Sequence, residues 1–225
     1  NHLWGNKNSI LTGDYLLGRC FEIMVEDGSL EVLKLLSSVS SEIAQGEILQ
    51  LQHEKEVETL EKTYLEIVGS KTSSLFAASM RVGGCINDKS KNEKEALTSF
   101  GFNLGICFQI TDDILDYYSN KIAFGKVIGN DFYEGKVTLP TIMLYQKSSE
   151  SERLALKEMF VRKERTKEEL AYTLNLMTKY QVIASCKKRA EHFSSVSADS
   201  LGIFPESKEK TRLQELAFYI VNRIN

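Results

Sequence analysis

The chain has 225 residues, of which 26% are charged, and its formal net charge is −3. This length suits one domain with a single core, and because only two prolines and 14 glycines interrupt the chain, long segments favour an all-α fold. The charge balance argues against nucleic-acid binding, and the absence of a run of ~18 apolar residues argues against an integral membrane segment.

The first quarter of the chain is predicted to form a loop followed by two helices. Residues 1–8 read as the loop. Apolar side chains at helical spacing predict a helix over residues 10–24, which Gly28 stops. Ser29 is a suitable N-cap for a second helix that runs to about residue 52.

The middle of the chain alternates short helices with polar links. We expect, in order, a charged link at 53–61, a short helix over 64–68, a polar stretch at 70–74, a helix over 75–82 that Gly83 and Gly84 end, and a polar turn at 87–91. The longest helix is predicted over 92–118.

The last part of the chain begins with a loop at 119–136 that is richer in charge than a turn requires. Pro140 then starts a helix over 141–146. Four further helices are predicted at 149–161, 166–178, 179–197 and 207–223.

The cysteines indicate a reducing compartment. They are far apart, form no CxxC pair and lie in apolar contexts at Cys20, Cys85, Cys107 and Cys186. This pattern predicts buried free thiols rather than disulfides or metal ligands. Because no signal peptide is recognisable, we expect a cytoplasmic protein, with peripheral contact to a membrane surface left open.

Three acids interrupt the apolar end of the longest helix, in the stretch FQITDDILD over residues 108–116. On a helix Asp112 and Asp116 share a face with Gln109, and Asp113 lies about 100° beside them. Carboxylates this close repel unless a cation neutralises them, and oxygen ligands suit Mg²⁺ better than zinc. The alternative is an exposed helix end with solvated aspartates. The apolar surroundings, and the macrodipole that disfavours negative charge there, favour a metal site.

The charged loop that follows could hold an anion. Its lysines, Lys126 and Lys136, lie among three glycines and suit a diphosphate that Mg²⁺ and lysines neutralise together. The alternative is a flexible basic loop. Lys71 followed by Thr72 is a weak signal by itself. The isolated histidines argue against serine–histidine or zinc chemistry.

Several stretches, taken in order, resemble one family, the trans-prenyl diphosphate synthases or polyprenyl synthetases. The matching pieces are GDYLL at 13–17, ExxQGE at 42–47, Lys71-Thr72, FQIxDDxLD at 108–116, GKxxGxD at 125–131 and EGKxTLP at 134–140. The resemblance implies an all-α isoprenoid synthase type helical bundle around a central cavity. Such enzymes join an allylic prenyl diphosphate to isopentenyl diphosphate with Mg²⁺.

The resemblance also implies roles for particular residues. Metal binding falls to Asp112, with Asp113 and Asp116 as ligands or support. Catalytic residues would be Lys71, Thr72 and Gln109, the last two lining the reacting carbons. The substrate-binding set would be Lys71, Gln109, Lys126, Asp131 and Lys136. Of these, the lysines would hold the allylic diphosphate, and Asp131 would brace the loop or the waters bound to the metal. The released diphosphate itself would take the final proton.

The sequence departs from the family in lacking its first aspartate-rich motif and the paired arginines that follow. We therefore expect that the 225 residues form a single domain whose N-terminal portion is missing. The alternative is a catalytically inactive regulatory subunit of a synthase. Overall resemblance to bacterial members predicts a long-chain, octaprenyl-type product for a quinone tail and a homodimer. A terpene cyclase is the third interpretation, which the loop before Pro140 argues against.

Overall fold

The computed structural model describes residues 3–118 and 128–224 and has an all-α fold, as predicted. No β-strand occurs within these residues. The helices are α1 (Gly5–Asp27), α2 (Leu30–Gln52), α3 (Glu61–Val68), α4 (Ser74–Cys85), α5 (Lys91–Tyr117), α6 (Asn130–Glu134), α7 (Leu139–Lys147), α8 (Glu150–Val161), α9 (Lys167–Lys179), α10 (Val182–Ser200) and α11 (Lys208–Asn222). A π-helical turn, η1 (Gly69–Ser73), joins α3 to α4, and a 3-10 turn, η2 (Leu201–Ile203), follows α10.

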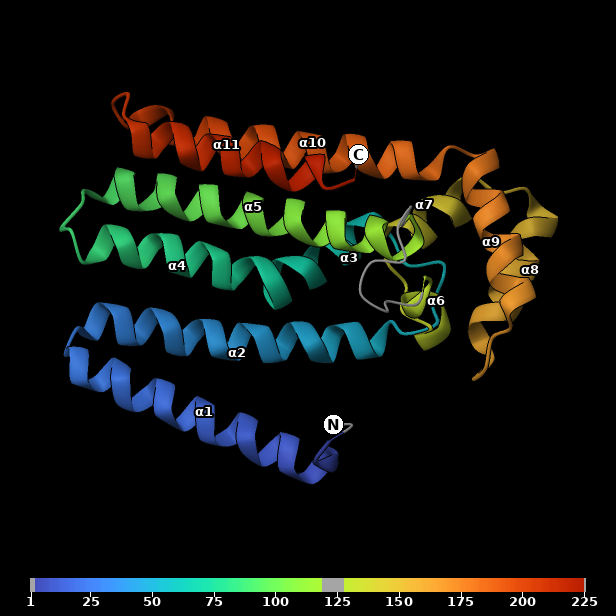
Figure 1. The fold of residues 1–225 in the computed structure, drawn as a ribbon, viewed down its shortest axis with the longest axis horizontal. Coiled ribbons are helices and arrows are strands. Elements are labelled where there is room, and N and C mark those ends of the chain that lie inside the picture. The colour runs from blue at the N-terminus through green and yellow to red at the C-terminus, as the bar shows by residue number, and fades with distance from the viewer. Residues whose placement is uncertain (1–2, 119–127, 225) are drawn as a thin grey trace.

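Helix α5 is the centre of the fold. The long helices α2, α4, α5, α10 and α11 run side by side, while α6 to α9 gather at one end (Figure 1). α5 packs between α4 and α10, and its residues Phe100, Ile110 and Ile114 are completely buried. This packing brings the acidic end of α5 next to α6 and α7.

Two glycines of α5 allow the neighbouring helix to approach closely. A Cβ on Gly101 would lie 2.4 Å from the carbonyl oxygen of Phe76, and one on Gly105 would lie 2.6 Å from Cα of Ser73. Real Cβ atoms essentially never come so near to backbone atoms. The close approach of α4 and η1 to α5 therefore depends on Gly101 and Gly105, respectively, having no side chain.

Replacing Gly105 with alanine is expected to lower the free energy of unfolding by about 1–3 kcal/mol, because the methyl group forces η1 away from α5. Chemical denaturation measures this change. Gly83→Ala is the matched control: Gly83 has open space around its Cβ position, and alanine there should stabilise the helix by about 0.5–1 kcal/mol. Equal effects of the two substitutions would contradict the close approach.

The predicted break at 70–74 and the predicted ending at Gly83 and Gly84 are both wrong. α3, η1 and α4 follow one another without a loop, and α4 continues to Cys85. A glycine ending needs left-handed backbone, which neither glycine adopts. Gly84 instead lies where α4 meets α5, since a Cβ there would be 3.1 Å from Cδ1 of Leu97.

Other helix boundaries differ by small amounts. Residues 5–8, predicted as loop, form the start of α1, and the predicted loop at 119–136 contains α6. The capped starts agree better with the structure. Ser29 caps α2 and Pro140 lies in the first turn of α7, as predicted. Ser90, which lies in the predicted polar turn at 87–91, forms a capping box with Glu93 at the start of α5.

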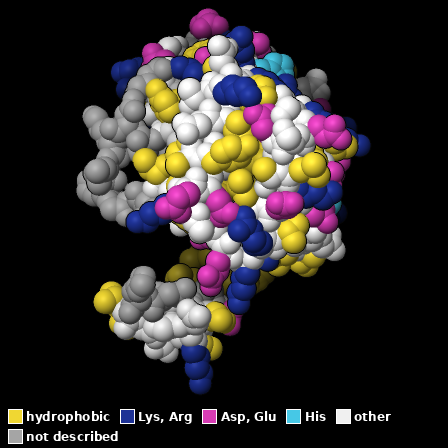
Figure 2. Space-filling view, turned by 90° about the vertical axis from the view of Figure 1, so that its right-hand side faces the viewer, with side chains coloured by type: hydrophobic (Ala, Val, Ile, Leu, Met, Phe, Trp, Pro, Cys, Tyr) yellow, Lys and Arg dark blue, Asp and Glu magenta, His cyan; other side chains and the backbone are white. Residues whose placement is uncertain are grey.

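Helix α1 stands apart from the rest of the molecule. It diverges from α2 toward its N-terminal end (Figure 1), and from the α8–α9 end it forms a separate lobe below the main body (Figure 2). Its exposed apolar residues include Ile10, Tyr15, Leu16 and Ile23. Cys20 is also exposed, so the predicted burial is wrong for this cysteine and correct for the other three, and all four thiols are free.

None of the described helices is long and apolar enough to cross a membrane. The end of the molecule seen in Figure 2 carries lysines, arginines and acids interspersed with apolar side chains. Neither sign of charge dominates this face.

Candidate functional site

The first acid of the cluster, Asp112, faces a residue from the other end of the chain. Its Oδ1 lies 3.3 Å from a guanidinium nitrogen of Arg223, and its side chain is 37% exposed. The Arg223 guanidinium also stacks over the ring of Phe108, 5.6 Å from the centroid. Asp112 thus offers a carboxylate that solvent and ions can reach.

The second acid, Asp113, points into the protein and has two donors. The Tyr64 hydroxyl donates to Oδ2 at 2.6 Å, and Nε2 of Gln109 donates to Oδ1 at 2.9 Å. Burial raises the pKa of Asp113 to about 7, although both hydrogen bonds lower it. Gln109 therefore pairs with Asp113, whereas the sequence placed it on the face of Asp112 and Asp116.

The third acid, Asp116, holds the start of α6. Its Oδ2 accepts a hydrogen bond from the backbone amide of Asp131 at 2.9 Å, and its carbonyl oxygen accepts one from Gly129 at 2.8 Å. Gly129 adopts a left-handed backbone with φ of 80°, which glycine allows without strain. These bonds fix α6 against the end of α5.

Lys136 lies just after α6, among acids. Its ammonium group is 2.6 Å from Glu134 and 3.7 Å from Asp131. Burial by itself lowers the pKa of Lys136, but the hydrogen bond to Glu134 and the surrounding negative charges outweigh burial and raise the pKa. Lys136 therefore stays positively charged at neutral pH.

Lys71 and Thr72 project from the π-helical turn η1. The Lys71 ammonium group lies 2.7 Å from Oε1 of Gln50 and 3.0 Å from Oε2 of Glu47, both on α2. The Thr72 hydroxyl donates to Oε1 of Gln109 at 3.0 Å. Functional sites frequently contain such π-helical turns, and this one directs two polar side chains toward α2 and α5.

One small cavity, of about 90 Å³, collects most of these residues. Its lining includes the predicted site residues Lys71, Thr72, Gln109, Asp113, Asp131 and Lys136. Asp112 and Asp116 are not among its lining residues, and Lys126 lies outside the described part of the chain. The tertiary structure thus brings together six side chains that lie between positions 71 and 136 of the sequence.

The three aspartates share one helix end but differ in what they contact. Among the described residues, no group of three or more His, Cys, Asp or Glu side chains could hold a metal ion. The reason is that Asp113 turns to Tyr64 and Asp116 to the amide of Asp131. The oxygen donors nevertheless fit a hard ion such as Mg²⁺, and Asp112 has the most accessible of the three carboxylates.

Sequence reasoning missed three side chains of this site. Tyr64 appeared only as an apolar position of a short helix, although an isolated tyrosine on a buried face needs a polar partner. Gln50 lay beside the matched stretch on α2 and was given no role. Arg223 carried no signal, because it lies more than 100 positions after Asp112.

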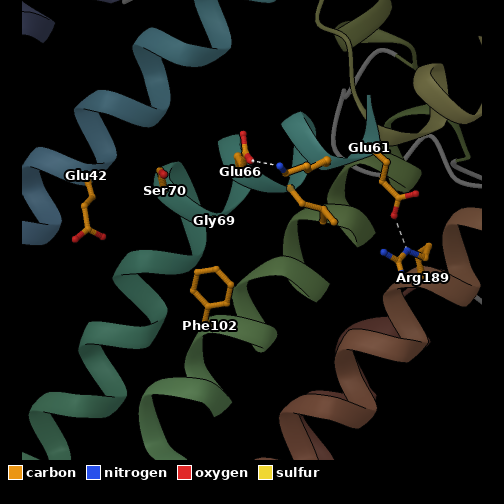
Figure 3. Close-up of a pocket in the computed structure, with 9 residues that line it drawn as sticks. Glu42, Glu61, Glu66, Gly69, Ser70, Phe102 and Arg189 are labelled. Carbon is orange, nitrogen blue, oxygen red and sulfur yellow. Dashed lines mark hydrogen bonds and ion pairs between the residues drawn. The ribbon is translucent and has the colours of Figure 1, made fainter. Parts of the chain in front are cut away.

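A larger cavity, of about 670 Å³, lies on the opposite face of α3 and contains none of the predicted site residues. Figure 3 shows Phe102 from α5 pointing toward Gly69, with charged side chains around it. The two basic side chains of this cavity are each paired with an acid. Nε of Arg189 lies 2.6 Å from Oε1 of Glu61, and Nζ of Lys62 lies 3.8 Å from Oε1 of Glu66. The smaller cavity therefore remains the candidate site.

Comparison with known proteins gives consistent similarities. The sequence matches the family "Polyprenyl synthetase" over residues 1–177. It is 30% identical to the octaprenyl diphosphate synthase of Haemophilus influenzae over 99% of this chain and 68% of that protein. It is 34% identical to the all-trans-nonaprenyl-diphosphate synthase (geranyl-diphosphate specific) of Rhodobacter capsulatus, over 100% of this chain and 68% of that protein.

Solved structures agree with these similarities. The polyprenyl synthase from Caulobacter crescentus CB15 complexed with calcium and isoprenyl diphosphate has a TM-score of 0.94 and 34% identity, covering 99% of this chain and 68% of that one. A decaprenyl diphosphate synthase from Rhodobacter capsulatus has a TM-score of 0.92 and 35% identity, covering 99% of this chain and 69% of that one.

Proposed function

Because the chain belongs to the polyprenyl synthetase family, whose members are prenyl-transferring enzymes, we propose that it condenses an allylic prenyl diphosphate with isopentenyl diphosphate. The observation that carries this proposal is the cavity between η1, α5 and the segment after α6, which lysines and acids line together. A diphosphate needs cations near it, and a metal that neutralises it needs carboxylates.

The cations of the site would bind the allylic diphosphate. Lys71 on η1 and Lys136 after α6 both line the cavity. Lys126 is proposed to join them. Mg²⁺, when bound, neutralises the leaving diphosphate. Asp112 would hold the ion, with Asp113 and Asp116 as ligands or support. Together these charges lower the barrier to breaking the bond between carbon and oxygen.

The carbocation that this ionisation leaves must be protected from water. Thr72 and Gln109 are proposed to line the reacting carbons, and Asp131 to brace the segment that carries Lys136. The aromatic rings of Phe76 on α4 and Phe108 on α5 pack against each other, with their centroids 5.5 Å apart. The departing diphosphate is proposed to accept the final proton, so no side chain is assigned as the base.

The product is proposed to be a long-chain polyprenyl diphosphate for a quinone tail. Relatives at similar identity carry the names octaprenyl, nonaprenyl and geranylgeranyl diphosphate synthase, so family membership alone leaves the length open. Resemblance to bacterial long-chain members supports the longer product. We further propose that the protein is a cytoplasmic homodimer.

Incubating the complete gene product with farnesyl diphosphate, isopentenyl diphosphate and Mg²⁺ is expected to give chains longer than geranylgeranyl diphosphate. Chromatography against prenyl alcohol standards measures the product length after dephosphorylation. Products no longer than geranylgeranyl would reject the long-chain proposal. Cyclic products formed without isopentenyl diphosphate would reject prenyl transfer in favour of a terpene cyclase.

The alternative is a catalytically inactive regulatory subunit of a prenyl diphosphate synthase. The similarities favour the enzyme, because the relatives named above are synthases. The coding sequence before Asn1 separates the two functions. Two aspartates followed by paired arginines in that sequence would support the enzyme, and an initiator codon directly before Asn1 would support the subunit.

A further inference from the structure

A continuous row of hydrogen bonds connects α3, α5 and η1. The Tyr64 hydroxyl and the Gln109 amide nitrogen both donate to the Asp113 carboxylate, at 2.6 and 2.9 Å, and the Thr72 hydroxyl donates to the Gln109 amide oxygen at 3.0 Å. Tyr64 and Asp113 are 4% and 3% exposed. All four side chains line the smaller cavity, where those of Tyr64 and Asp113 are almost entirely buried.

The two hydrogen bonds of the Gln109 side chain fix how its amide group is oriented. An amide has one donating and one accepting end. Because Nε2 of Gln109 donates to Asp113, Oε1 faces Thr72 and accepts its hydroxyl. Reversing the amide would place two acceptor oxygens, those of Gln109 and Asp113, against each other.

Tyr64 completes the arrangement by occupying the other oxygen of Asp113. Oδ2 accepts from Tyr64 and Oδ1 from Gln109, so the carboxylate is held at both ends. Without the Tyr64 hydroxyl, this buried carboxylate would lose a donor and could rotate about its side-chain bonds. The amide of Gln109 and the hydroxyl of Thr72 would then lose their fixed positions.

We propose that Tyr64 is a positioning residue that acts through Asp113 and Gln109 to fix Thr72 on the π-helical turn. On this assignment Asp113 supports the reacting side chains, and binding of Mg²⁺ depends on Asp112. The inference rests on the proposed function, because it concerns side chains assigned to the reacting carbons. It adds a role for Tyr64, which the sequence placed only on the buried face of a short helix.

The test is the Tyr64→Phe variant of the complete gene product, which removes one hydroxyl and keeps the ring. We expect kcat to fall about tenfold or more, since hydrogen bonds to charged groups are the strong ones. The Mg²⁺ concentration for half-maximal rate and the KM for the allylic diphosphate should change less than about twofold, because one hydroxyl carries little of the binding.

Tyr117→Phe is the matched control. Tyr117 is 5% exposed, and its hydroxyl pairs with Thr141 at 3.2 Å, outside the row. This variant should keep the kcat of the unaltered protein, and thermal unfolding of both variants measures any loss of stability. A kcat of Tyr64→Phe equal to that of Tyr117→Phe would overturn the inference and leave the proposed function intact.

A double-mutant cycle separates positioning from a general structural role. If Tyr64 acts through Thr72, adding Thr72→Val to Tyr64→Phe should lower kcat much less than Thr72→Val does alone. Fully additive effects would overturn the inference, as would a parallel loss of Mg²⁺ affinity in Tyr64→Phe. Absence of prenyl product from the unaltered protein would reject the proposed function, and the inference with it.

Discussion

Replacing Asp112 with alanine is expected to lower kcat/KM by about a thousandfold, because it removes the carboxylate on which the proposed Mg²⁺ site depends. Folding should be nearly unaffected. Asp112 is partly exposed and its ion pair with Arg223 spans 3.3 Å at a site where both side chains reach solvent. Pairs of this kind contribute about 0–1 kcal/mol to stability.

Steady-state kinetics over a range of Mg²⁺ concentrations, together with thermal unfolding, measures both effects. Asp199→Ala is the matched control, because Asp199 is an exposed acid on α10 at the end far from the cavity. This control should keep full activity. Normal turnover in Asp112→Ala would count directly against the metal assignment, and a large fall in its melting temperature would show that the carboxylate serves packing.

Replacing Lys71 with alanine is expected to raise the KM for the allylic diphosphate about a hundredfold, since a cation at a phosphate makes one of the stronger hydrogen bonds. The Lys71 ammonium group reaches the cavity between Gln50 and Glu47. The position of η1 against α2 should survive this substitution, because Gly46 of α2 packs against the main chain of Lys71.

Initial rates at varied concentrations of the allylic diphosphate give this KM. Lys62→Ala is the control: Lys62 is 86% exposed, lies on the opposite face of α3 and pairs weakly with Glu66. Its KM should equal that of the unaltered protein. If Lys71→Ala raised the KM for isopentenyl diphosphate and left that for the allylic substrate unchanged, the assignment of Lys71 would be wrong.

Most helices could be predicted because their signals are local. Ser29 satisfies a free amide group of the turn that directly follows it, and Pro140 fits the first turn of α7. The prediction of the α4 ending failed because glycine can either end a helix or allow a neighbouring helix to pack closely. Gly84 looked like a helix ending, yet it provides room for α5, and only the position of α5 distinguishes the two.

Part of the candidate site was predicted, because its residues lie in short sequence stretches that can be recognised. Lys71, Gln109 and Lys136 were chosen from stretches that resemble a family, and the structure places them around one cavity. Their roles remain predictions, as does that of Lys126, which lies outside the described residues. Helical spacing correctly put the aspartates at one helix end but could not tell which direction each carboxylate takes.

The sequence by itself determined the all-α class, the long helix with an acidic end and the family, because periodicity, capping and ordered motifs depend on residues that are near one another in the chain. Only the tertiary structure decided that Asp112 meets Arg223 and that Asp113 meets Tyr64. Such partners come from distant segments, and their contacts exist only after the helices pack. The acid cluster therefore contains three carboxylates with three different environments.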